Sequence, residues 1–158
     1  MILTSWGQKT TFQKFRVLSC PEKWWVVTHP FVAKKAHKIT LEVRKTVEGL
    51  KNDTILKGIG NGLQIDAFRH AYWMALLTRE IGWRRSNKLG KAHEKGNYKT
   101  YKKGEVEDGV LPDKISSEMD LHNNGVGIDI GKKINVENLK NEVIQAVKLG
   151  RCNTNLIS

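Results

Sequence analysis

Hydrophobic positions three and four residues apart predict an amphipathic helix in the first third of the chain. They share one face between residues 31 and 50, with lysines opposite, and are Phe31, Ala36, Ile39, Val43, Val47 and Leu50. Thr28 as N-cap and Pro30 in the first turn are typical of a helix start. Residues 1–27 are expected to be irregular or short extended structure, because Pro21 interrupts them and WWVV (24–27) is an apolar run typical of a strand.

The next segment, residues 61–81, is apolar almost all round, which is typical of a helix covered on several sides. Its apolar positions are Leu63, Ile65, Phe68, Ala71, Trp73, Met74, Leu76, Leu77 and Ile81. Helical patterns follow at 83–95, where Gly96 is a plausible C-cap, and at 116–131 and 135–150, with a polar connector over 97–115. The glycines at 125 and 127 are costly inside a helix, so another backbone or a ligand is expected to come close there.

These patterns predict a mainly α protein, a compact bundle of four to five helices with an irregular or short β N-terminal segment. A chain of 158 residues has the ordinary length of one domain. We therefore expect a single domain over 1–158, with a helical core at 28–150 and a tail at 151–158.

The chain is strongly basic, with 27 Lys and Arg against 16 Asp and Glu and a net charge of +11. Such a surplus favours an anionic substrate or surface, such as phospholipid, nucleic acid or the cell wall, or an acidic immunity protein. KTYKK (99–103) interleaves basic and aromatic residues, as a surface that follows phosphates does. A solvated surface that only confers solubility explains the charge equally well.

No run of about 18 apolar residues occurs, so no transmembrane segment is predicted. The N-terminus lacks the basic and apolar regions of a secretory signal. The chain is expected to be secreted by a leaderless route or as part of a larger exported protein, and to be cytoplasmic if neither holds. Cys20 and Cys152 are too sparse for a disulfide framework or a metal-binding spacing, and free thiols are expected.

The first group of candidate functional residues forms a stripe on the segment 61–81. Residues three, four and seven apart share a helix face, so Asp66, Arg69, His70 and Trp73 line up on an otherwise apolar helix. Burying such a stripe is expensive unless its members pair or border a pocket. The alternative to a functional site is an Asp66–Arg69 ion pair with His70 hydrogen-bonded inside the core.

Two further groups lie downstream. His93 and Glu94 are adjacent at a predicted helix end, where an imidazole beside a carboxylate suits metal ligation or acid–base chemistry, although the HExxH spacing of zinc proteases is absent. In MDLHNNGVG (119–127), Asp120, Asn123 and Asn124 share a helical face whereas His122 points elsewhere. Asparagines inside a helix need partners, and they orient histidines or donate to phosphate oxygens.

The motifs DAFRHAYW, AHE and MDLHNNGVG, in this order, resemble an uncharacterised bacterial family known as a domain of unknown function. Some members of that family lie at the C-termini of secreted or polymorphic-toxin-like proteins. The resemblance covers about residues 60–131. It implies a site and a secretion context, and it supplies no mechanism.

The combination predicts a metal-assisted hydrolase acting on a phosphate-containing or polyanionic substrate. The predicted metal ligands, for zinc or manganese, are Asp66, His70, His93 and His122. The predicted catalytic residues are Arg69, His70, Glu94, Asp120, His122 and Asn123. Glu94 would be the general base, and Arg69 would stabilise developing negative charge.

Two other functions remain open at this point. One is a metal-free cell-wall glycosidase, with Glu94 as the acid and Asp120 or Asp66 as its partner carboxylate. The other is a non-enzymatic basic binding module, acting through residues 83–104, in which the histidines and acids only form a buried hydrogen-bond network.

Overall fold

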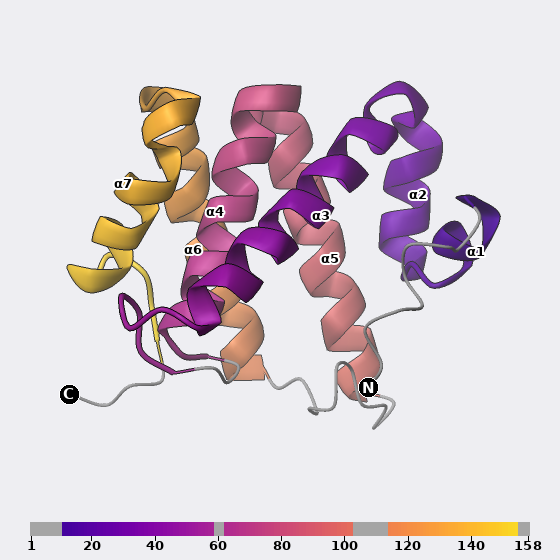
Figure 1. Ribbon diagram of the computed structural model, residues 1–158. Helices are drawn as coiled ribbons and strands as arrows, with labels where there is room; N and C mark the ends of the chain where they lie inside the picture. Colours follow the sequence, from indigo (N-terminus) through magenta and orange to yellow (C-terminus); the bar gives the residue numbers. More distant parts are fainter. Residues whose placement is uncertain (1–10, 59–61, 103–113, 155–158) are drawn as a thin grey trace.

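The computed structural model describes residues 11–58, 62–102 and 114–154, and every regular element in these ranges is an α-helix (Figure 1). The helices are α1 (Thr11–Arg16), α2 (Cys20–Thr28), α3 (Pro30–Lys51), α4 (Gln64–Ile81), α5 (Trp83–Lys102), α6 (Lys114–Lys133) and α7 (Val136–Lys148). Helices α3 to α7 correspond to the five that the hydrophobic pattern predicts. The prediction of a compact, mainly α bundle is confirmed.

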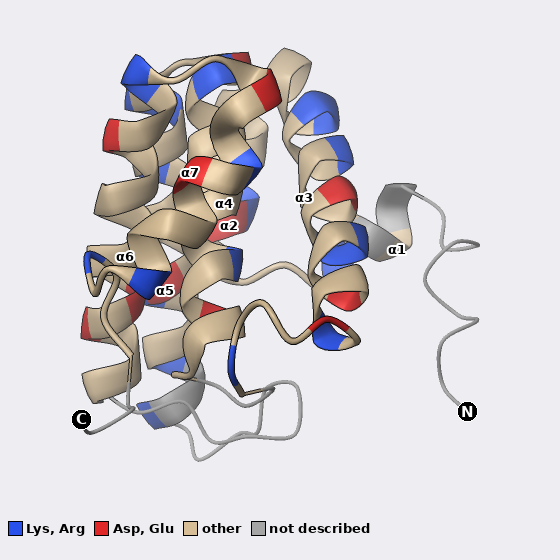
Figure 2. Ribbon diagram, turned by 60° about the vertical axis from the view of Figure 1, so that its left-hand side comes forward, with Lys and Arg blue, Asp and Glu red and all other residues tan. Residues whose placement is uncertain are grey.

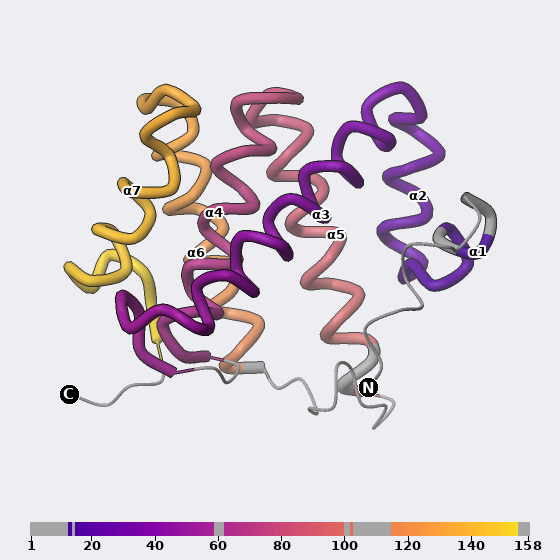
Figure 3. Tube along the Cα trace, viewed as in Figure 1, coloured from indigo at the N-terminus to yellow at the C-terminus, as the bar shows by residue number. Residues whose placement is uncertain are grey.

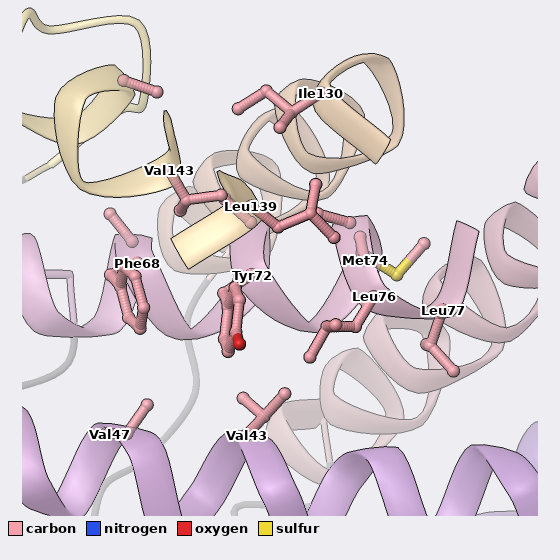
Figure 4. Close-up of a cluster of buried hydrophobic side chains, with 14 of the residues drawn as sticks. Val43, Val47, Phe68, Tyr72, Met74, Leu76, Leu77, Ile130, Leu139 and Val143 are labelled. Atoms are coloured by element: carbon pink, nitrogen blue, oxygen red, sulfur yellow. The ribbon is translucent and has the colours of Figure 1, made fainter. Parts of the chain in front are cut away.

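Helix α4 is the centre of the bundle, as its nearly uniform apolar character predicts. It packs against α3, α5, α6 and α7. Phe68, Met74 and Leu77 of α4 are fully buried, and Figure 4 shows them between side chains of α3, α6 and α7. Burial of one such side chain contributes about 1.5–3 kcal/mol to stability. Helix α4 therefore stabilises the fold strongly, and the polar residues on it are held in fixed positions.

Helix α3 lies diagonally across the bundle, and its apolar stripe faces α4 as predicted, with one exception (Figure 1). Ala36, Ile39, Val43, Val47 and Leu50 are all buried. Phe31, predicted on the same face, is instead 97% exposed. The diagonal path explains the difference, because the first turn of α3 lies beside α2 and away from α4 (Figure 1).

The expectation of an irregular or β N-terminal segment is wrong for residues 11–16 and 20–28, which form helices α1 and α2. Ser19 and Glu22 make a capping box, in which Glu22 Oε2 accepts from the Ser19 N–H at 2.9 Å and Ser19 Oγ accepts from the Glu22 N–H at 3.5 Å. Pro21 therefore lies in the first turn, where it is tolerated, and does not interrupt the segment. The N-cap of α3 is His29, not Thr28. Residues 1–10 lie outside the described part of the chain.

Helix α5 continues to Lys102, well past the predicted end near residue 95. Gly96, predicted as a C-cap, lies inside the helix, and a Cβ at this position would clash with Ser19 Oγ at the start of α2. The missing side chain lets α2 approach α5. The remainder of the predicted connector, residues 103–113, is not among the described residues.

Helices α4 and α6 run side by side and cross closely (Figures 1 and 3). A Cβ on Gly127 would lie 2.1 Å from the backbone oxygen of Ala71, and one on Gly131 would lie 2.5 Å from that of Ala75. The close approach predicted at Gly127 is confirmed, whereas Gly125 has nothing within 4 Å of its Cβ position.

The segment 151–154, predicted as part of a tail, folds back on the bundle. The Arg151 N–H donates to the carbonyl of Ala146, and Cys152 is buried. Burial raises the pKa of the Cys152 thiol to about 11. Cys20 and Cys152 are free thiols, as expected. Residues 155–158 lie outside the described part.

The Lys and Arg residues lie along the outer faces of several helices, with the acids scattered among them (Figure 2). Among the described residues, no helix is both long enough and apolar enough to cross a membrane.

Candidate functional site

The polar stripe on α4 begins with Asp66 in the first turn of the helix, and both of its carboxylate oxygens are engaged. Oδ2 accepts a hydrogen bond from the Gly62 N–H at 2.7 Å, and Oδ1 lies 2.6 Å from Arg69 Nη2. The helix N-terminus favours a carboxylate at this position. These two contacts fix the orientation of the Asp66 side chain without any ligand.

Helices α4, α5 and α6 bring three carboxylates around one imidazole. His70 Nε2 lies 3.4 Å from Asp120 Oδ1 and 3.8 Å from Asp66 Oδ1, and His70 Nδ1 lies 3.7 Å from Glu94 Oε1. The side chains of His70, Glu94 and Asp120 are only 4%, 3% and 13% exposed. We call Asp66, His70, Glu94 and Asp120 the carboxylate–histidine cluster. The first and second predicted groups and Asp120 from the third thus meet in one place.

The cluster holds more negative charge than its neighbours neutralise. Burial, with the nearby charges of Glu94 and Asp66, raises the pKa of Asp120 to about 8. Burial also raises the pKa of Glu94, against the opposing effects of His93, Asn124 and Arg69. Buried carboxyl groups whose pKa is raised by neighbouring carboxylates mark a place where a further cation would be stabilised.

His70 is neutral, and its hydrogen-bond pattern defines which nitrogen carries the proton. Burial lowers the pKa of His70 well below its usual value, and the charges of Arg69 and His93 act in the same direction. Arg69 Nη2 lies 3.1 Å from His70 Nε2, and because a guanidinium only donates, Nε2 is the acceptor. The proton is therefore on Nδ1, facing Glu94 Oε1.

Asn124 lies next to this proton. Its Nδ2 donates to Glu94 Oε1 at 3.3 Å. Its Oδ1 and the Nδ1 of His70 are both buried, and neither has a hydrogen bond of ordinary geometry with a described residue. The Asn124 side chain nevertheless interacts with His70, because its hydrogen bond raises the pKa of His70 against the effect of burial.

Asp66, His70 and Asp120 form a group that could hold a metal ion. One ligand atom from each lies within 4.8 Å of the others. Zinc holds nitrogen and oxygen ligands at about 2.0–2.2 Å, which places neighbouring ligand atoms roughly 3–3.5 Å apart. The distances of 3.4 and 3.8 Å from His70 Nε2 to the two carboxylates are close to that spacing.

The Arg69 guanidinium lies against two of the three candidate metal-binding residues. The same Nη2 atom contacts Asp66 Oδ1 and His70 Nε2, which are two of the three candidate ligand atoms. Its side chain is 39% exposed, so the arginine can move outward into solvent. In the structure, Arg69 is thus the cation that balances the cluster.

His93, predicted as a metal ligand, is engaged elsewhere. Its Nδ1 is hydrogen-bonded to Glu22 Oε1 of α2 at 2.9 Å, and its ring centroid is 6.4 Å from that of His70. Trp73 packs edge-on against His93 at 5.5 Å and donates from Nε1 to Thr40 Oγ1 at 3.0 Å. His93 therefore borders the cluster and links it to α2.

His122 and Asn123 are not brought into the cluster, in contrast to the prediction. The exposed His122 lies with Nε2 2.9 Å from the carbonyl oxygen of Arg151. Asn123 is buried and holds the Asn153 backbone, donating to its carbonyl at 3.0 Å and accepting from its N–H at 2.8 Å. The helical rotation between positions 120 and 122 carries His122 to the opposite side of α6.

Two residues at the site were missing from the predicted catalytic and metal-binding residues. Asn124 is part of the third motif, and its shared face with Asp120 was the signal for it. Glu22 lies outside all three motifs, and hydrogen bonds from His93 and Ser19 lower its pKa although burial alone would raise it. The capping-box spacing of Ser19 and Glu22 was the only signal for this carboxylate.

Residues 23–153 match the profile of a family described as a domain of unknown function, DUF6973. The chain belongs to this family. The DUF6973 match extends on both sides beyond the range of about 60–131 that the three motifs cover, so it includes most of α2 and all of α3 to α7. No curated protein and no solved structure matches the chain.

Proposed function

We propose that this chain is a metal-assisted hydrolase of phosphate-containing substrates. The observation that carries the proposal is the buried Asp66, His70 and Asp120 group, whose His70 presents an unprotonated Nε2 to two carboxylates. A neutral imidazole nitrogen and carboxylate oxygens are the ligands that zinc and manganese take in proteins. The basic charge of the chain favours phospholipid or nucleic acid as the substrate class.

A purely structural hydrogen-bond network explains the carboxylate–histidine cluster less well than a metal site does. Such a network stabilises a fold when every buried member is well paired, and here the His70 and Asn124 side chains interact without a hydrogen bond of ordinary geometry. Three carboxylates also share a site with a single arginine, and burial beside the other two carboxylates raises the pKa of Asp120 to about 8. A divalent ion relieves that imbalance.

In the proposed mechanism, Asp66, His70 and Asp120 hold the ion. A bound divalent ion lowers the pKa of a water molecule toward 7 and polarises a phosphoryl oxygen. Glu94, predicted as the general base, faces the Nδ1 side of His70, and its role in this proposal is to orient the imidazole, as carboxylates beside metal-bound histidines do.

With an ion held by these residues, Arg69 would be released from Asp66 and would be free to neutralise charge developing on the phosphoryl oxygens. Water attacks phosphorus and loses a proton to solvent, and the bond from phosphorus to the leaving oxygen breaks. The alcohol leaves after taking up a proton. Atoms and charge balance without any further reactant.

The test is phosphodiester cleavage by chelated protein before and after Zn²⁺ or Mn²⁺ is added, with bis(p-nitrophenyl) phosphate and phospholipid vesicles as substrates. Asp120→Asn removes a proposed ligand and is expected to lower the rate by about 100-fold or more. Asp129→Asn is the matched control, because Asp129 is a highly exposed acid on the same helix. Metal-independent turnover, or equal rates for the two variants, would contradict the proposal.

A metal-free cell-wall glycosidase is the second candidate, and one observation favours it. Its pKa of about 8 favours a protonated Asp120 at neutral pH, so Asp120 would take the role of general acid that the sequence analysis gave to Glu94. Release of soluble fragments from purified cell wall in the presence of a chelator, lost in Asp120→Asn, would establish this activity in place of the first.

The biological context is also part of the proposal. Export by a leaderless route or within a larger protein, action as a toxin or effector, and neutralisation by an acidic immunity protein are consistent with the strong positive charge and with the resemblance of the motifs to toxin-like proteins. Toxicity on expression in bacteria, relieved by His70→Ala, would support this context. Healthy growth at high expression of the intact chain would count against it.

A further inference from the structure

A shallow groove runs between α2 and α5, near His93 and on the outer side of α5. Its volume is about 620 Å³, and its walls include Trp24 and His29 from α2 and its end, and Lys88, Lys91, Lys95 and Lys99 from α5. The close packing of Ser19 on Gly96 fixes the spacing between the two helices. None of the three sequence motifs predicts this groove.

The lysines form one row along α5. They are spaced by three, four and four residues, so neighbouring ammonium groups share a face of the helix and repel one another. The only acid of α5 is Glu94, which is buried in the carboxylate–histidine cluster. No described residue forms an ion pair with any of the four lysines. A helix face of like charges without acids is destabilising by itself, and it is typical of a surface that binds an anion.

The opposite wall is aromatic and rigid. Trp24 is 71% exposed, whereas its neighbour Trp25 is buried, donates from Nε1 to the Arg85 carbonyl at 3.2 Å and stacks on His29 at 4.9 Å. The buried tryptophan therefore fastens α2 to α5, and the exposed one presents a flat indole face at the groove. An exposed indole beside a row of lysines combines a stacking surface with a cationic track.

We propose that this groove binds single-stranded nucleic acid, with phosphates along the lysine row and a base stacked on Trp24. The row from Lys88 to Lys99 is about 16 Å long at the α-helical rise of 1.5 Å per residue. That length accommodates about five stacked nucleotides at a rise of roughly 3.4 Å each. The lysine row and Trp24 line opposite sides of the groove, so a single strand lying in it could place its phosphates on one side and a base on the other.

The proposal stands on the groove alone and does not depend on the metal-binding cluster. If both proposals are correct, the groove identifies nucleic acid as the phosphate-containing substrate. Binding is therefore measured with a chelator present, where the proposed hydrolase cannot act, so that failure of one proposal is distinguishable from failure of the other.

The experiment is a fluorescence anisotropy titration of the intact chain against a labelled single strand of about 12 nucleotides, which is longer than the lysine row. Four lysine–phosphate contacts predict a slope of log affinity against log salt of about −3, at roughly −0.7 per contact. Lys91→Glu/Lys95→Glu is expected to weaken binding by at least about tenfold and to halve that slope. Trp24→Ala is expected to weaken binding by about tenfold, since its exposed ring supplies the stacking surface.

Lys140→Glu/Lys148→Glu is the matched control, because it changes the net charge equally on exposed positions of α7, at the other side of the bundle (Figure 1). Unchanged affinity in this control, with loss in the two groove variants, supports the proposal. Equal weakening in the control would show a general charge effect and overturn it. Absence of binding, or binding to phosphatidylserine vesicles without binding to the oligonucleotide, would also overturn it.

Discussion

Two glycines of α6, Gly125 and Gly127, are expected to change stability in opposite directions when each is replaced by alanine. The reason is that only Gly127 lies at the close crossing with α4. At Gly127 a Cβ would lie 2.1 Å from the backbone oxygen of Ala71, and real Cβ contacts are essentially never shorter than 3.0 Å. At Gly125, two residues earlier, the Cβ position has no neighbour within 4 Å. Both glycines are in the interior of the same helix, so intrinsic helix propensity affects them equally.

The magnitudes follow from these contacts. In Gly127→Ala the helices must separate by at least 0.9 Å (3.0 minus 2.1), and the obstacle is backbone rather than a flexible side chain. Overpacking of this kind costs about 3 kcal/mol, and alanine regains about 1 kcal/mol of helix propensity. The net loss of about 2 kcal/mol lowers Tm by roughly 4–8 °C for a chain of this length. Gly125→Ala gains about 1 kcal/mol and raises Tm by roughly 2–4 °C.

The assay is thermal unfolding of both variants, followed by circular dichroism, with urea unfolding as an independent measure. The substitution at Gly127 also reaches the site, because moving α6 away from α4 carries Asp120 away from His70. Metal uptake is therefore expected to weaken in Gly127→Ala and to stay unchanged in Gly125→Ala. Equal Tm shifts in the two variants would refute the close crossing and, with it, the geometry of the cluster.

Three further predictions concern the site. In chelator, the free energy of unfolding falls by up to about 1.4 kcal/mol per pH unit as the pH rises from about 4 to about 8, because folded Asp120 keeps a proton that the unfolded chain has lost. Urea titrations of Asp120→Asn should lack this fall. Arg69→Gln removes the positive charge beside Asp66, so calorimetry should show Zn²⁺ binding that is about tenfold tighter. Unchanged or weaker binding would contradict the proposal that Arg69 and the metal ion compete for the same carboxylates. Asn123→Ala should cost about 2 kcal/mol and leave metal content intact, since it deletes two hydrogen bonds to the C-terminal segment; loss of metal would place this residue in the site after all.

The sequence predicted the central helices well because their apolar periodicity is dictated by the packing. The stripe at 36–50 and the uniformly apolar α4 are the same features that the structure buries. Helix α2 was missed because its composition favours a strand, while its actual determinants are the Ser19–Glu22 capping box and a proline in the first turn. Local end signals outweighed β propensity in this segment.

The site was predictable in part for the same reason. Helical spacing placed Asp66 and His70 on one face, and the motifs also indicated Glu94 and Asp120, whose approach to His70 from two other helices only the structure shows. His122 was included for its chemistry, although its position on the helix already turned it away from Asp120. The link from His93 to Glu22 spans 71 residues of sequence, and no local pattern can indicate such a contact.

The most direct test of the proposed function is the metal content of the purified protein, measured by elemental analysis before and after chelation and reloading. We expect about one equivalent of zinc or manganese per chain. The metal should be lost in His70→Ala and Asp120→Asn and retained in His122→Ala, because the His122 imidazole lies outside the cluster. No metal in the native protein, together with no calorimetric uptake of added Zn²⁺ or Mn²⁺, would contradict the account. Equal loss of metal in His122→Ala would contradict the ligand assignment.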